Sequence, residues 1–240
     1  MEIKIDKLIP RGYGYYEAPI PGSKYKLIIK NEKIIAVVHR GYKLIPHEEV
    51  EDVLKRLQGV KVLRAIEENA KKFWILDVGR GDVQMMVVNS VDGGRALTVR
   101  LMLVVDNLAI PLITSSRRTA MVMKKVHKKS ADPVVLVDSI KAMLKDVDEV
   151  KEYYEQIFKK KAAEYLSTWQ LLKEEIPDKY TETIITVLST PAGAKLTVGE
   201  VYKEIAKRIL SAKTDFGTKL MFMRKLNDTL MIIAEAERYE

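Results

Sequence analysis

The stretch FWILDVGRGDVQMMVVNSVDGGRALTVRLMLVV, residues 73–105, decides the fold of this chain. Its three apolar runs are separated by GRGD and by DGG, which contain residues that tolerate the positive φ angles of tight turns. The last run alternates, so one face should be core while the other, which carries Arg100, should be partly wet. The sequence therefore predicts an antiparallel meander with strands at 73–78, 83–90 and 96–105.

Shorter elements precede the meander. The three residues Asn31-Glu32-Lys33 separate two apolar runs at the spacing of a hairpin. A later segment has acidic residues in its first turn, basic residues in its last turn and Gly59 behind it, which indicates a short amphipathic helix. The predicted elements are strands at 25–30, 34–39 and 60–66 and a helix at 47–57.

After Ser130 the apolar period changes to three and four residues, which indicates helices. Asp132-Pro133 is typical of a helix start, and Thr197 with Glu200 forms a capping box. The predicted helices run from 133 to about 172 with a possible break near Ser167, from 177 to 190, from 198 to 210 and from 218 to 238. We therefore expect an α+β fold, in which antiparallel hairpins and a meander with one short helix precede a C-terminal helical part packed on them. The predicted parts are a basic β-rich region, 1–130, and an α-helical region, 131–240, which can also form a single domain.

Composition narrows the chemistry. The 240 residues include 41 Lys plus Arg, 33 Asp plus Glu, three His and no Cys, so disulfide frameworks, zinc–thiolate sites and thiol nucleophiles are excluded. No phosphate-binding loop, dinucleotide fingerprint or catalytic motif is present, and the histidines lack metal-ligand spacing. The sequence predicts no cofactor, no metal and a non-enzymatic role.

The net charge of +8 is unevenly distributed. Residues 1–130 carry 24 basic and 14 acidic side chains, or +10, and residues 131–240 carry 17 and 19, or −2. A charge excess confined to one part predicts an anionic partner, and we expect nucleic acid of unspecified type. The predicted contact strip consists of Arg100, Arg117, Arg118, Lys124, Lys125, Lys128 and Lys129. The same residues are also explained by an alternative without a ligand, a basic face that is simply exposed to solvent.

The N-terminal segment RGYGYY, residues 11–16, offers a second candidate surface. Its tyrosines could stack on unpaired bases, and equally they could cover one edge of a sheet. Neither interpretation is excluded by the sequence.

Two further functions stay open. Asp77, Asp82 and Asp92 lie near strand ends and could form the Mg²⁺ site of a nuclease, although such acids are usually turn formers. The helical seam after Pro133 could pair between chains in a homo-oligomer or a virion-associated assembly, or pack on the chain's own sheet.

The segment from Asn89 to His127 resembles a family of phage- and plasmid-encoded proteins of unknown function. Its motif Asn-Ser-x-Asp-Gly stands here as Asn89, Ser90, Asp92 and Gly93, followed by Asn107 at a strand end and by His127. The strand-end Arg and Cys of that family are absent from this chain. From the residues themselves, Asp92 and Gly93 should turn a hairpin, Asn89 and Ser90 should bond the turn backbone, and Asn107 should cap a strand end.

Abundant Lys and Glu with few Asn and Gln is a bias reported for hyperthermophiles. Together with the resemblance, it implies an accessory protein of a virus or plasmid of hyperthermophilic archaea, acting in the host cytoplasm. We expect no membrane association, because the most apolar window, 101–113, is too short to span a bilayer and the N-terminus lacks an apolar signal region.

Overall fold

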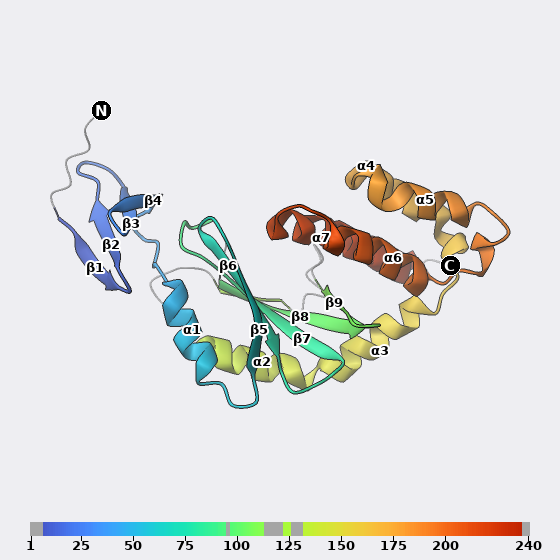
Figure 1. Ribbon diagram of the computed structural model, residues 1–240, viewed down its shortest axis with the longest axis horizontal. Coiled ribbons are helices and arrows are strands. Elements are labelled where there is room, and N and C mark those ends of the chain that lie inside the picture. The colour runs from blue at the N-terminus through green and yellow to red at the C-terminus, as the bar shows by residue number, and fades with distance from the viewer. Residues whose placement is uncertain (1–6, 95–96, 113–121, 126–131, 237–240) are drawn as a thin grey trace. The chain divides into compact units, whose positions relative to one another are not determined.

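The computed structural model describes residues 7–94, 97–112, 122–125 and 132–236 (Figure 1). They fall into two compact units. The first comprises the described residues within Met1–Arg80, Gln84–Arg100 and Val122–Ala142, and the second those within Gly81–Val83, Leu101–Met121 and Met143–Glu240. Whether residues 1–130 and 131–240 fold independently of each other, as the predicted boundary near residue 130 implies, stays a prediction.

Antiparallel strands form two sheets before a helical C-terminal part, which confirms the predicted α+β class. The N-terminal sheet has the order β1 (Ile9–Gly12), β2 (Tyr15–Pro19), β3 (Tyr25–Lys30) and β4 (Lys33–His39). The predicted hairpin of β3 and β4 is confirmed, and its tip is the two-residue turn Asn31-Glu32, with φ of 49° and 63°. Two successive residues at positive φ define the turn that matches the twist of a hairpin.

The central sheet contains the predicted meander. Its order is β10 (Val122–Lys125), β8 (Leu97–Val105), β7 (Val83–Ser90), β6 (Lys71–Asp77) and β5 (Lys61–Glu68), with β9 (Leu108–Pro111) paired to β8. The face of β8 that was expected to be partly wet is mostly covered, because Thr98 and Met102 are both 4% exposed, while Arg100 on the same face is half-buried. A strand covered on both faces loses the simple in–out alternation.

The helix α1 (His47–Lys55) forms where it was predicted. Val50, Val53 and Leu54 are its buried apolar residues, and its Glu51 accepts a hydrogen bond from Trp74 Nε1 at 3.1 Å. The same carboxylate lies 2.8 Å from Lys72 Nζ. The helix therefore packs on the face of β6 that carries the indole.

The C-terminal part is helical, as predicted. Its elements are α2 (Val135–Lys145), α3 (Val147–Phe158), α4 (Leu166–Glu175), α5 (Asp178–Leu188), α6 (Val198–Ser211) and α7 (Phe216–Ala236), with 3-10 turns at Ala162–Tyr165 and Gly193–Lys195. The predicted capping box is present, since Glu200 N donates to Thr197 Oγ1 at 3.2 Å and Thr197 N donates to Glu200 Oε2 at 2.8 Å.

The single long helix expected from 133 to about 172 was wrong, since the chain breaks it after Lys145 and again after Phe158. At the second break Lys160 O accepts from Val198 N, and Ala162 N donates to Leu196 O, both at 2.8 Å. These residues make an extended bridge with a distant segment, and that pairing replaces the helical hydrogen bonds that local sequence favours.

The helical seam after Pro133 is mostly buried inside the chain. Ile140, Val147 and Tyr154 are at most 2% exposed, and the other seam residues are half-buried. Packing within the chain therefore accounts for these residues, and pairing between chains stays a prediction. Among the described residues, no helix is long and apolar enough to cross a membrane.

The tip of the β3–β4 hairpin provides a test of the fold. Glu32 is an exposed, non-glycine residue at positive φ, a conformation that costs an L-residue about 1 kcal/mol. We expect Glu32→Gly to raise the free energy of unfolding by up to about 1 kcal/mol in urea titrations. The control Glu32→Ala removes the same carboxylate but keeps the Cβ, and it should give no such gain. Equal effects of the two variants would show that charge, not backbone conformation, is responsible.

Candidate nucleic-acid interface

The predicted basic strip is only partly within the described residues. Arg100 is half-buried on β8, while Lys124 and Lys125 lie in β10 opposite Thr98 and Leu97 of β8. The other predicted contacts, Arg117, Arg118, Lys128 and Lys129, lie outside the described residues, as does His127. The strip therefore stays a prediction.

The Asn-Ser-x-Asp-Gly residues have structural partners. Asp92 Oδ1 accepts hydrogen bonds from the Ser90 hydroxyl and, at 2.8 Å, from Gly94 N, while Gly93 has a φ of 76°. Asp92 and Gly93 therefore make the predicted turn, but Ser90 bonds the Asp92 side chain and not the turn backbone. Burial raises the pKa of Asp92, and these two hydrogen bonds outweigh it and help to hold the pKa below its usual value. Asn107 has a φ of 62° in the turn between β8 and β9, directly after the end of β8, and its role as a strand cap stays a prediction.

Asn89 departs from the expectation that it bonds the turn backbone. Its side chain is fully buried, and Nδ2 donates to Ile45 O at 2.9 Å and to His47 Nδ1 at 3.0 Å. Because Nδ1 accepts, the proton of a neutral His47 ring is on Nε2, which is buried without a hydrogen-bond partner among the described residues. Burial lowers the pKa of His47 to about 4. Asn89 therefore fixes the start of α1.

The three aspartates considered for a metal site make separate local contacts. Asp77 Oδ1 accepts from Gly79 N at 2.8 Å, and Asp82 lies 2.9 Å from Lys151 Nζ. Asp77 and Asp92 follow opposite ends of the β6–β7 ladder. In the described ranges no three His, Asp or Glu side chains are grouped as metal ligands would be.

The three neighbouring tyrosines of the RGYGYY segment have different roles. Tyr13 donates its hydroxyl to Asp52 Oδ2 at 2.6 Å, and this bond raises its pKa. Tyr15 is 2% exposed, and its hydroxyl accepts from Lys30 Nζ at 3.0 Å. Tyr16 is 40% exposed and points to the opposite side of β2. Tyr16 thus lies exposed on a face of the sheet, whereas the exposed Tyr13 lies in the turn before β2.

Strand register places Tyr16 on a continuous surface. Residues paired across antiparallel strands share a face of the sheet, and alternate residues share it along a strand. We call this surface of the N-terminal sheet the open face; it carries Tyr16, Ala18, Tyr25, Leu27, Ile29, Ile34, Val37 and His39. The opposite face contributes Tyr15, Ile28 and Val38 to a core with Leu44 and Val91.

The open face is apolar yet exposed. Ala18, Leu27 and Ile29 form a buried floor, and around them Tyr25 is 41% exposed and Val37 58% exposed. Ile34 is 54% exposed. Clustered apolar exposure of this kind usually marks a binding surface.

Two rings stand together at one end of the open face. Tyr25 and His39 are paired across β3 and β4, with ring centroids 6.2 Å apart in an edge-to-face arrangement. His39 Nδ1 accepts from Gly41 N at 3.1 Å, which orients the imidazole and leaves Nε2 to donate. Lys24 Nζ lies 5.8 Å from the Tyr25 ring centroid, and Arg40 Nη2 donates to Ile20 O at 2.7 Å.

The segment that builds this sheet is basic. Residues 7–43 contain eight Lys or Arg and two acids, which gives 8 − 2 = +6. One of the acids, Glu17, is buried and lies 2.7 Å from Arg11 and 2.8 Å from Lys26. Exposed cations, among them Lys24 and Arg40, therefore border an aromatic and aliphatic surface.

The open face was not predicted. The available signal was that β4, the last strand of its sheet, carries apolar residues on both of its faces. This pattern could not show that one face is exposed, because a strand that is apolar on both faces is ordinarily buried on both. No family model, curated protein or solved structure matches the chain.

The buried His47 predicts an acid-sensitive stability. The folded state holds the neutral ring with a pKa of about 4, whereas the unfolded chain takes up the proton below about 6.5. The contribution of the neutral His47 ring to the free energy of unfolding is fully present above pH 6.5 and is lost as the pH falls towards 4. At pH 5 the loss is about 2 kcal/mol. In urea titrations at pH 7 and 5, His47→Gln should remove this part of the loss.

His39→Gln supplies the matched control for the removal of an imidazole, since His39 is exposed on β4. If His47→Gln showed the same loss between pH 7 and 5 as the unsubstituted chain, carboxylates and not the imidazole would cause it.

Proposed function

We propose that this protein binds single-stranded nucleic acid on the open face of its N-terminal sheet, without catalysing a reaction on it. The observation that carries the proposal is the exposed Tyr16 and the Tyr25–His39 ring pair on one apolar surface within a segment of net charge +6. Bases offer a flat ring to stack on an aromatic side chain, and phosphates attract the bordering cations.

The spacing of the rings favours an unpaired strand. Tyr16 lies opposite Ile29, four residues along β3 from Tyr25, so the two positions are roughly 13 Å apart at about 3.3 Å per residue. Successive bases in a duplex are about 3.4 Å apart and stack on each other. A ligand that stacks on both ends of the open face must therefore be extended and unstacked.

The predicted basic strip would add phosphate contacts in this proposal. Phosphate contacts position a strand without reading its bases. The same proposal includes a role as an accessory protein of a virus or plasmid. This part rests on the resemblance of the Asn89-Ser90 motif to the phage- and plasmid-encoded family. Coating or guiding an unpaired strand needs no active site.

Substitution of the rings tests the open face. We expect Tyr16→Leu and Tyr25→Leu each to weaken binding of a fluorescent single-stranded oligonucleotide about 5- to 150-fold in anisotropy titrations, because stacking contributes about 1–3 kcal/mol per base. Tyr13→Leu is the matched control, since Tyr13 is 48% exposed but lies in the turn before β2. Equal affinities of all three variants would exclude the open face.

A salt series separates the two basic regions. Each phosphate contact to a single strand contributes about −0.7 to the slope of log affinity against log salt. The double variant Lys24→Gln with Arg40→Gln should reduce this slope by about 1.4 if both side chains contact phosphates. If only the double variant Arg117→Ala with Arg118→Ala changed the slope, binding would be assigned to the predicted basic strip.

Sedimentation tests a different occupant of the open face. If the chain sedimented in a concentration-dependent way and Val37→Ser abolished this, the open face would be a contact between two copies of the chain.

A further inference from the structure

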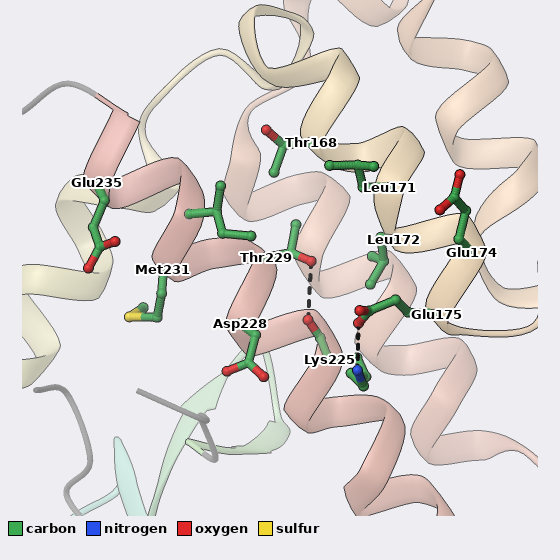
Figure 2. A pocket seen from close by; sticks show the side chains of 11 residues that line it. Thr168, Leu171, Leu172, Glu174, Glu175, Lys225, Asp228, Thr229, Met231 and Glu235 are labelled. Carbon is green, nitrogen blue, oxygen red and sulfur yellow. Dashed lines mark hydrogen bonds and ion pairs between the residues drawn. The ribbon is translucent and has the colours of Figure 1, made fainter. Parts of the chain in front are cut away.

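The second unit carries an open groove that the proposed function does not use. The groove lies between α4 and α7, which pack against each other, and has a volume of about 540 Å³ (Figure 2). Leu172 and Met231, which are 2% and 6% exposed, line it from the two helices. The groove therefore belongs to a packed pair of helices.

Two exposed aliphatic side chains border the groove. Leu171 is 58% exposed on α4, and Ile232 is 52% exposed on α7. Neither is needed to hold its helix in the core, because α4 buries Trp169 and Leu172 while α7 buries Leu226 and Leu230 among others. Two helices thus each present an aliphatic residue to one groove and expose it to solvent.

The border of the groove is acidic. Four carboxylates line it, those of Glu174, Glu175, Asp228 and Glu235, against the single cation Lys225, a sum of −4 + 1 = −3. Lys225 Nζ lies 2.9 Å from Glu175, an ion pair that Figure 2 marks, and Arg224 Nε lies 3.8 Å from Asp228, so Glu174 and Glu235 carry the excess negative charge of the border. Within the described residues Glu174 and Glu235 make no ion pair. This charge is opposite to that of residues 7–43.

Apolar floor and acidic border together specify the partner. An amphipathic helix binds a groove between two helices with its apolar stripe, and its flanking charges should be complementary to the rim. We propose that the α4–α7 groove docks an amphipathic helix of another protein in which Lys or Arg flanks an aliphatic stripe. A second copy fits less well, because a two-fold contact between identical grooves would face carboxylates with carboxylates.

The acidic border also repels nucleic acid, so the groove and the open face take different ligands. The docking proposal stands independently of the proposed function: it concerns other residues, in the other unit, and a ligand of opposite charge.

The test uses the full chain and a fluorescent helical peptide of Leu and Lys, with the Leu residues at helical spacing. Its counterpart has Glu in place of Lys. We expect the Leu/Lys peptide to bind at least tenfold more tightly than the Leu/Glu peptide in anisotropy titrations. Comparable binding of the two peptides would overturn the proposal.

Variants locate the binding. Leu171→Ser with Ile232→Ser should weaken the Leu/Lys peptide at least tenfold, whereas Val187→Ser, an exposed aliphatic on α5, should not. Glu174→Gln with Glu235→Gln should weaken it and reduce its salt dependence, and Glu182→Gln on α5 is the matched control. Unchanged binding in both groove variants would overturn the assignment. So would self-association of the chain that Leu171→Ser with Ile232→Ser abolishes, because a second copy would then occupy the groove.

Discussion

The first unit depends on a set of buried and partly buried polar bonds around residues 42–47. Lys26 Nζ donates to Tyr42 O at 2.7 Å, and the Tyr42 hydroxyl donates to Ser90 O at 2.9 Å. Asn89 then holds Ile45 O and His47 at the start of α1. These bonds connect the N-terminal sheet, α1 and β7 through groups shielded from water, where a lost partner costs about 1–3 kcal/mol. They orient the inner face of the N-terminal sheet towards Leu44 and Val91.

This orientation explains why the open face exists. Lys26 and Tyr15 point inwards, so their neighbours Leu27 and Tyr16 must point outwards, because the side-chain period of a strand is two. A register slip by one residue would bury Tyr16 and expose Glu17, which is matched to Arg11 and Lys26. The same ion pairs that fix the register therefore fix which rings are presented.

The sequence predicted the elements whose signals are local. The meander and the β3–β4 hairpin follow from alternation and turn residues, and the start of α6 follows from Thr197 and Glu200 alone. It could not predict the break after Phe158, which depends on pairing with residues 196–198, or the partner of Asn89, which lies 44 residues away. The open face was missed for a related reason. The apolar residues of β4 occupy both faces of the strand, and the sequence does not show that only one of these faces is covered.

Both candidate surfaces keep aliphatic side chains where a polar one would fold equally well. Val37 on β4 and Leu171 on α4 are each 58% exposed, and neither contributes to the buried cores beneath them. Scattered exposed aliphatics are ordinary, but here each lies beside others and beside charges that are mainly of one sign. In the two proposals, the opposite charges of the two surfaces would keep a polyanion from the groove and a basic helix from the open face, so electrostatics would separate the two ligands before shape discriminates between them.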